Sequence, residues 1–156
     1  MENNKKNYQL LFKNQEKRTA LIKELEEYLN LTIQGIKSNY KITGEIEKNS
    51  EKYNFYINNF FQEIQKLNDE LKKLGETETE AYKKDIKFLL CLESENYKIT
   101  LDIFNNNIKC FDILKNEDDD HKLIKKEKEI SILKETLSSI REQINDFITN
   151  LKYKIL

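Results

Sequence analysis

The chain has 156 residues, room for one domain, and it contains no proline, so long helices can run without interruption. The charged fraction of 35% is typical of helices that expose much of their surface to water. A net charge of −1, with lysine and glutamate alternating, argues against a nucleic-acid-binding surface, and the longest apolar run, residues 88–92, is too short to cross a membrane. We therefore predict an all-α, cytoplasmic protein without direct membrane insertion.

A 4-3 repeat of core positions begins at Ile22 and keeps its register to Leu74. Seven-residue spacing keeps one stripe of a helix facing a partner, as in a coiled coil. We predict a disordered or frayed N-terminus over residues 1–16, and then a coiled-coil region over 17–114 whose first helix is long and runs to about residue 74. In this helix, the stripe that we assign to a partner interface (the seam) consists of Ile22, Leu25, Leu29, Ile36, Asn39, Ile46, Tyr53, Ile57, Phe60, Ile64, Leu67, Leu71 and Leu74.

The centre of the seam is polar. Short polar residues stand at four of its core positions, namely Thr32, Asn39, Thr43 and Ser50. An asparagine at such a position can fix the register and the number of strands at a cost in stability. Gly35 and Gly44 weaken the same stretch, so a loosely packed or kinked middle section explains it equally well.

Gly75 is predicted to end the long helix, because glycine accepts the left-handed conformation that often follows a helix. Thr77 with Glu80 has the spacing of a capping box and would begin a second helix over about 78–114. One continuous helix with a bend at Gly75 is the alternative. The apolar residues of the second helix form two neighbouring rows, a broad arc that needs more than one covering helix. Its residues that we assign to the interface are Leu89, Leu92, Ile99 and Ile103.

An acidic linker over residues 115–120 is predicted to precede a C-terminal coiled-coil helix over 121–156, whose positive dipole end the carboxylates would stabilise. The 4-3 repeat returns in this helix, and its interface residues are Ile130, Leu133, Leu137, Ile140, Ile144, Phe147 and Leu151. The aromatic cluster Tyr53, Phe55, Tyr56, Phe60 and Phe61 is wider than a two-stranded seam requires. The sequence therefore predicts an extended helical bundle with a further partner-binding face.

The chain offers little for catalysis or metal binding. His121 is the only histidine, and its neighbours Asp118, Asp119 and Asp120 lack the alternating spacing and the glycine of a calcium loop. A solvated helix cap explains this segment better than a metal site. Cys91 and Cys110 lack a metal-ligand spacing and indicate a reducing compartment. No phosphate-binding glycine loop is present. We expect a protein that is not an enzyme and that binds no cofactor and no metal.

The chain resembles subunit 2 of the biogenesis of lysosome-related organelles complex over about residues 25–110. The matching residues are Tyr28-Leu29, Tyr40-Lys41, Lys52-Tyr53, Leu67-Asn68 and the stretch from Leu92 to Ile99, which is similar to the family's Leu-Glu-x-x-x-Tyr-Lys-Leu. The resemblance implies a small scaffold subunit that assembles with other short helical chains on endosomes and lysosomes, in complexes for vesicle trafficking and lysosome positioning. It implies no catalytic residue.

Three functional hypotheses follow. The first is a scaffold subunit of such a trafficking complex, in which any contact with endosome or lysosome membranes is peripheral and made through partners. The second is a subunit of another helical assembly, such as a kinetochore, transcriptional mediator or ciliary transport complex. The third is a self-associating coiled-coil structural protein. Broad apolar faces favour the first two, because a homodimer seam does not need them.

Overall fold

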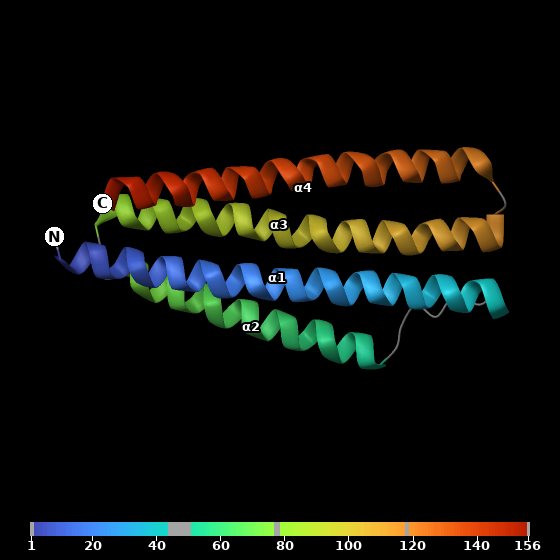
Figure 1. Cartoon of the computed structure of the whole chain (residues 1–156), viewed down its shortest axis with the longest axis horizontal. Helices are drawn as coiled ribbons and strands as arrows, with labels where there is room; N and C mark the ends of the chain where they lie inside the picture. Colours follow the sequence, from blue (N-terminus) through green and yellow to red (C-terminus); the bar gives the residue numbers. More distant parts are fainter. Residues whose placement is uncertain (1, 44–50, 77–78, 118, 156) are drawn as a thin grey trace.

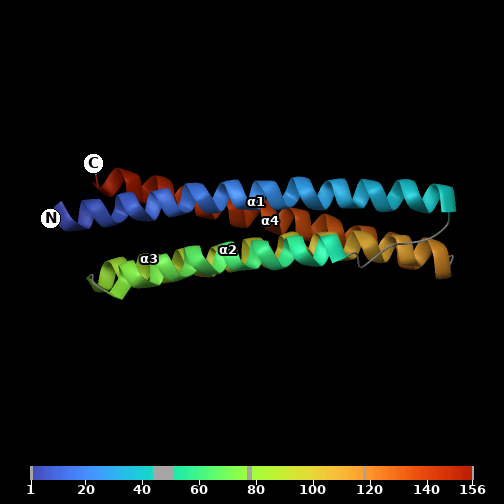
Figure 2. The ribbon, with the colours of Figure 1, turned by 90° about the horizontal axis from the view of Figure 1, so that it is seen from below.

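The structure, a computed structural model, describes residues 2–43, 51–76, 79–117 and 119–155. Within these ranges every regular element is helical, and the predicted all-α helical bundle is confirmed. The helices run alternately up and down one long axis, and both ends of the chain lie at the same end of the bundle (Figures 1 and 2). The elements are α1 (Glu2–Thr43), α2 (Glu51–Glu76), α3 (Glu80–Asp112), a π-helical segment (Ile113–Glu117) and α4 (Asp120–Ile155).

α1 and α2 form an antiparallel pair. Asn14 Nδ2 donates to the Leu67 carbonyl at 2.9 Å, whereas further along α1 the Tyr28 ring stacks on Tyr56 with centroids 3.8 Å apart. Residues later in α1 therefore contact residues earlier in α2, as in two helices that fold back on each other. The predicted single helix to about residue 74 is wrong. Folding back lets the two apolar halves of the seam bury one another within one chain. Gly44, Ile46 and Ser50 lie outside the described residues.

The N-terminal segment is helical from Glu2, and the prediction of a disordered or frayed end over residues 1–16 is wrong. Leu11 is 0% exposed, and the Tyr8 hydroxyl donates to Asp85 Oδ2 at 2.9 Å. The stabilising contacts come from residues that are far away in the sequence. The local apolar period, on which the prediction rested, contains no information about them.

The alternative of one continuous helix with a bend at Gly75 is wrong, because α2 and α3 are separate helices that lie side by side. Phe60 stacks on Tyr97 at 5.2 Å, and Gly75 lies beside Ile86, so the two helices are antiparallel. Gly75 lies inside α2, which ends at Glu76, and its backbone is not in the left-handed region that we predicted. Thr79, rather than Thr77, caps α3 by accepting from the Tyr82 amide at 3.4 Å; Thr77 lies outside the described residues.

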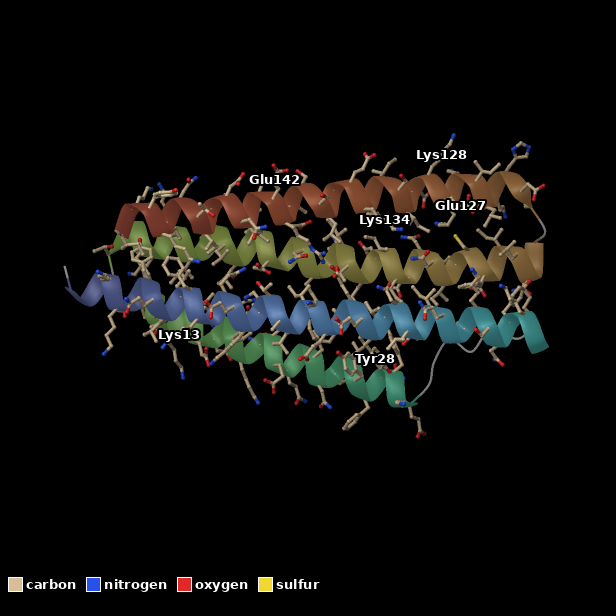
Figure 3. All side chains as sticks on the ribbon, viewed as in Figure 1. Lys13, Tyr28, Glu127, Lys128, Lys134 and Glu142 are labelled. Atoms are coloured by element: carbon tan, nitrogen blue, oxygen red, sulfur yellow. The ribbon has the colours of Figure 1, made fainter. Side chains whose placement is uncertain are left out.

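α4 begins with an acidic cap, as the sequence predicts. Asp119 Oδ1 accepts from the backbone amides of His121 at 3.0 Å and Lys122 at 3.2 Å. Charged side chains such as Lys128 and Glu142 project from the outer side of α4 (Figure 3). The inner sides of the helices form two clusters of buried apolar residues. One contains Leu11, Leu71, Tyr82, Ile86, Leu89, Ile99, Leu137, Ile140, Ile144 and Leu151, and the other contains Ile22, Leu25, Leu29, Phe60 and Phe104.

Candidate functional site

Most residues that we assigned to a partner interface lie in the chain's own core. The buried ones are Ile22, Leu25, Leu29, Ile36, Phe60, Leu67, Leu71, Leu89, Ile99, Ile130, Leu137, Ile140, Ile144 and Leu151. The half-buried ones are Asn39, Tyr53, Ile57, Ile64, Leu74, Leu92, Ile103, Leu133 and Phe147, whereas Ile46 lies outside the described residues. The 4-3 repeat thus marks the buried side of each helix, but helices of the same chain cover that side. Contact of these residues with another chain stays a prediction.

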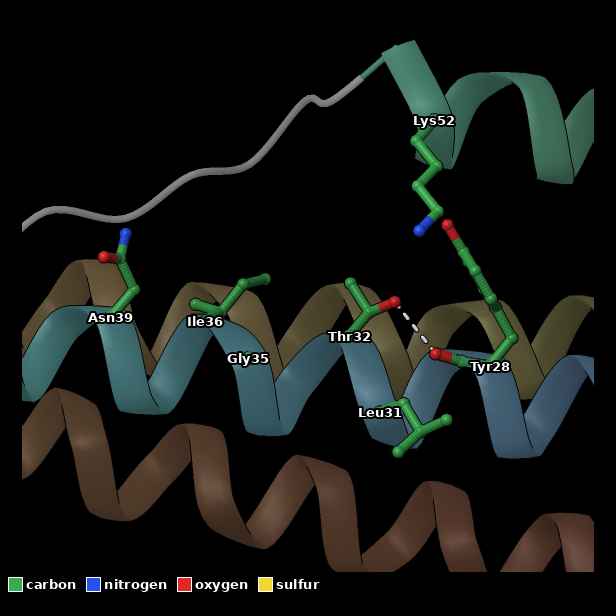
Figure 4. Close-up of a pocket in the computed structure, with 7 residues that line it drawn as sticks. All are labelled: Tyr28, Leu31, Thr32, Gly35, Ile36, Asn39 and Lys52. Carbon is green, nitrogen blue, oxygen red and sulfur yellow. Dashed lines mark hydrogen bonds between the residues drawn. The ribbon is translucent and has the colours of Figure 1, made fainter.

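A more accessible surface lies where α1 runs on past the first turn of α2 (Figure 1). We call the depression on this flank of α1 the α1 groove (Figure 4). Its volume is about 600 Å³, and it is lined by Tyr28, Leu31, Thr32, Gly35, Ile36, Asn39 and Lys52. All but Lys52 come from successive turns of α1, so the groove follows one flank of this helix beside the start of α2.

The α1 groove has an apolar side chain at its edge and open space along its wall. Leu31, which borders the groove, is 66% exposed. A Cβ atom added at Gly35 would meet no described residue within 4 Å. The Thr32 hydroxyl donates to the Tyr28 carbonyl at 2.8 Å, so this polar group is satisfied inside the helix. The groove is therefore suited to an apolar side chain from outside.

The aromatic cluster that we predicted as a partner face is divided by the structure. Phe60 is 4% exposed and belongs to the core, whereas Phe55 is 70% and Phe61 46% exposed. Tyr53 stacks on Phe104 at 5.4 Å, and burial raises the pKa of the Tyr53 hydroxyl. The stacked rings thus hold α2 on its neighbours, and the exposed phenylalanines remain available to a partner.

A polar cluster joins α1, α3 and α4 in the middle of the bundle. Gln15 Nε2 donates to Glu93 Oε1 at 2.6 Å, and Asn96 Nδ2 donates to Glu93 Oε2 at 3.3 Å. Arg141 of α4 donates to Asn96 Oδ1 at 3.0 Å and pairs with Glu26 of α1. These hydrogen bonds and the ion pair link three helices and fix their relative register, and Gln15 Oε1 is the one atom of the cluster that is buried without a partner among the described residues. No local pattern marks this cluster, because its members are far apart in the chain.

A second polar set lies between α1 and α2. Arg18 is 2% exposed, and its Nη1 donates to Asn68 Oδ1 at 2.8 Å. Burial lowers the pKa of this guanidinium, while the negative charges of Glu93 and Glu70 oppose the shift. Its contacts join the two helices.

The described residues contain no group of three or more His, Cys, Asp and Glu side chains that could hold a metal ion. His121 is exposed, and the neighbouring Asp119 serves as the cap of α4. Cys91 is exposed and Cys110 half-buried, and neither forms a disulfide. Burial and the nearby Glu127 raise the pKa of the Cys110 thiol. Within the described part of the chain, no helix is both long enough and apolar enough to span a membrane.

Comparison of the chain with protein-family models, curated proteins and solved structures finds no match. The resemblance to subunit 2 of the biogenesis of lysosome-related organelles complex therefore stays a prediction. The structure by itself shows an all-helical bundle that leaves several large apolar side chains in water. These are Leu10, Leu31, Phe55, Phe61, Phe88, Leu114, Ile124, Ile132 and Tyr153.

Proposed function

We propose that this chain is a non-enzymatic scaffold subunit that joins other helical chains into a hetero-oligomeric complex. The observation that supports this function is the α1 groove, which lies where α1 runs on past the first turn of α2 (Figure 1) and which is bordered by Leu31, 66% exposed. A partner helix placed along α1 beyond the start of α2 would continue the line of α2. It would cover the apolar flank as α2 covers the earlier part of α1.

The binding energy would come from a few apolar side chains. Phe55 stands three residues after Lys52, so both lie on the same face of α2, and Lys52 lines the α1 groove. Burial of a leucine or phenylalanine side chain contributes about 1.5–3 kcal/mol. Leu31 and Phe55 together would therefore contribute about 3 kcal/mol or more. This is a substantial share of the binding free energy of about 8 kcal/mol that corresponds to a micromolar dissociation constant.

The cellular setting of this scaffold follows only from the resemblance, which implies peripheral association with endosomes or lysosomes through the partner chains. A kinetochore, transcriptional mediator or ciliary complex would use the same α1 groove. The identity of the chains that co-purify with the protein separates these settings.

The test uses one exposed residue and a matched control. Leu31→Glu places a charge in the α1 groove, where a covering partner helix would have to bury it at a high cost. Ala20→Glu introduces the same side chain at another exposed position of α1, outside the groove. Both variants should keep the circular dichroism spectrum of the wild type. Each is tagged, expressed in the source cell and purified with its bound chains.

We expect Leu31→Glu to lose helical partner chains that the wild type and Ala20→Glu retain. Equal recovery of those chains with both variants would contradict a role for the α1 groove. Recovery of copies of this chain alone would favour a self-associating structural protein instead.

A further inference from the structure

A second depression lies at the opposite end of α2 from the α1 groove, between the last turns of α2 and the first turns of α3. We call it the lysine groove. Its volume is about 410 Å³. Lys72 from α2 and Lys83 and Lys87 from α3 line it, together with an apolar floor. It is separate from the α1 groove, which Lys52 borders at the start of α2.

The floor of the lysine groove consists of Gly75, Ile86 and Leu90. Ile86 is 4% exposed and Leu90 is half-buried. Among the described residues, a Cβ atom at Gly75 would meet Ile86 Cδ1 at 3.5 Å, an ordinary van der Waals distance, and no second side chain within 4 Å. Glycine inside a helix lowers its stability relative to alanine. Here the missing side chain leaves room above Ile86 for an apolar group from outside.

The rim is positively charged. Lys72, Lys83 and Lys87 are all exposed, and Lys83 and Lys87 stand one helical turn apart. Lys83 Nζ lies 3.6 Å from Glu80 Oε1, a pair in which the glutamate side chain is 94% exposed and therefore easily exchanged for another carboxylate. Glu76 is the acidic residue of the lining, so the lysines outnumber it.

We propose that the lysine groove binds an acidic amphipathic helix of a partner protein. Two antiparallel helices with an apolar floor accept a third helix through apolar side chains spaced three and four residues apart. One such side chain would fill the space above Gly75 and Ile86. Carboxylates one turn apart on the partner would face Lys83 and Lys87, which are also one turn apart. Charge complementarity of this kind speeds association and selects the partner.

This proposal does not rest on the α1 groove. It assigns a second surface, at the other end of α2, and specifies the charge of its partner. With both surfaces occupied, one chain would bridge two different helices.

The probe is a fluorescent synthetic peptide that forms an amphipathic helix, with leucines on one face and glutamates flanking them. A matched peptide carries lysine in place of every glutamate. Each is titrated with the full chain, and binding is followed by fluorescence anisotropy. We expect the acidic peptide to bind at least about tenfold more tightly than the basic one. Its affinity should fall severalfold between about 0.05 and 0.5 M salt, because salt screens exposed charges.

Three variants locate the binding site. Gly75→Leu fills the floor, and the double variant Lys83→Glu with Lys87→Glu reverses the charge of the rim. Gly35→Leu makes the same glycine substitution in the α1 groove, where a Cβ atom would meet no described residue within 4 Å. We expect the first two to weaken binding of the acidic peptide at least about tenfold and Gly35→Leu to leave it unchanged. If Gly75→Leu does not fold, the double variant at two exposed residues still tests the rim.

Three results would overturn the proposal. The first is equal binding of the acidic and basic peptides, and the second is binding of the acidic peptide by the double variant with the affinity of the wild type. The third is that vesicles containing phosphatidylserine bind in a manner that depends on Lys83 and Lys87 whereas the acidic peptide does not, which would assign the groove to a membrane surface.

Discussion

The hydroxyl of Tyr97 gives a sharp test of how α2 packs on α3. Its ring stacks on Phe60 with centroids 5.2 Å apart and meets Phe61 edge-on at 5.1 Å. The hydroxyl oxygen is buried and has no hydrogen-bond partner in the described structure. Burial raises the pKa of this hydroxyl. On folding, the group gives up hydrogen bonds to water and gains none.

Replacement of Tyr97 with Phe removes the unpaired oxygen and keeps both ring contacts. An unsatisfied buried polar group costs about 1–3 kcal/mol. Since Tyr97 as a whole is only half-buried, we expect Tyr97→Phe to raise the free energy of unfolding by about 1 kcal/mol, at the lower end of that range.

Tyr82→Phe is the matched control, because it removes the same hydroxyl oxygen from a tyrosine whose hydroxyl forms a hydrogen bond. The Tyr82 hydroxyl donates to the Asn7 carbonyl at 3.0 Å, and Tyr82 is 1% exposed. We expect this variant to lower the free energy of unfolding by about 1 kcal/mol. Urea unfolding at pH 7, followed by far-ultraviolet circular dichroism, measures both changes. The dependence of the free energy of unfolding on urea concentration should be the same for the wild type and the two variants. If Tyr97→Phe is as destabilising as Tyr82→Phe, the contact between α2 and α3 differs from the one described.

Three other measurements address the cluster, the buried tyrosines and the thiols. Because the pKa of Tyr97 is raised, the folded state holds this proton more tightly than the unfolded chain. The free energy of unfolding therefore has its highest value below the ordinary tyrosine pKa of about 10 and falls as the pH rises further. A urea midpoint that stays constant from pH 9 to about 11.5 would contradict this. Arg141→Ala should lower the free energy of unfolding by about 1–3 kcal/mol in urea, and exposed Lys134→Ala by less than about 0.5 kcal/mol; equal effects would exclude a stabilising polar cluster. Iodoacetamide should modify exposed Cys91 before half-buried Cys110, whose pKa is raised, and mass spectrometry that finds the reverse order would contradict the packing of α3.

The helical class and the buried side of each helix could be predicted from the sequence because both depend on local spacing. Leu25 and Leu71 stand on the predicted stripe and are 0% exposed. Ile140, on the stripe of the C-terminal helix, is 8% exposed. A repeat of 3.5 residues determines which side of a helix is apolar, whichever chain supplies the covering helix.

The pairing of the helices could not be predicted in this way. A seam that continues from Ile22 to Leu74 has the same register in one long helix and in two helices that fold on each other. The choice depends on tertiary contacts such as that of Asn14 with the Leu67 carbonyl. The burial of Leu11 depends likewise on distant residues, and no local pattern marks it.

The α1 groove was only partly predictable. Thr32 and Asn39 stand out in the sequence as polar residues at core positions of the seam, and both line the groove. Leu31 lies off the 4-3 stripe and is exposed, so the repeat does not mark it as part of the groove. Gly75 could not be assigned from local preference alone. A glycine there is compatible with the predicted helix end and equally with its observed place inside α2, at the floor of the lysine groove.

The antiparallel pairing of α1 and α2, which creates the α1 groove, is tested most directly by one distance in solution. Lys17 and Asp69 are exposed and stand next to Arg18 and Asn68, whose side chains are hydrogen-bonded at 2.8 Å. Spin labels are attached to cysteines at these two positions after Cys91 and Cys110 are replaced with serine. Labelled protein is diluted with unlabelled protein so that only distances within one chain are measured by pulsed electron paramagnetic resonance. Helices that pack about 8–10 Å apart predict a single distance of about 10–25 Å once the labels are included. One continuous helix would place the two positions about 78 Å apart at 1.5 Å per residue, and a distance near that value would contradict the hairpin and the α1 groove with it.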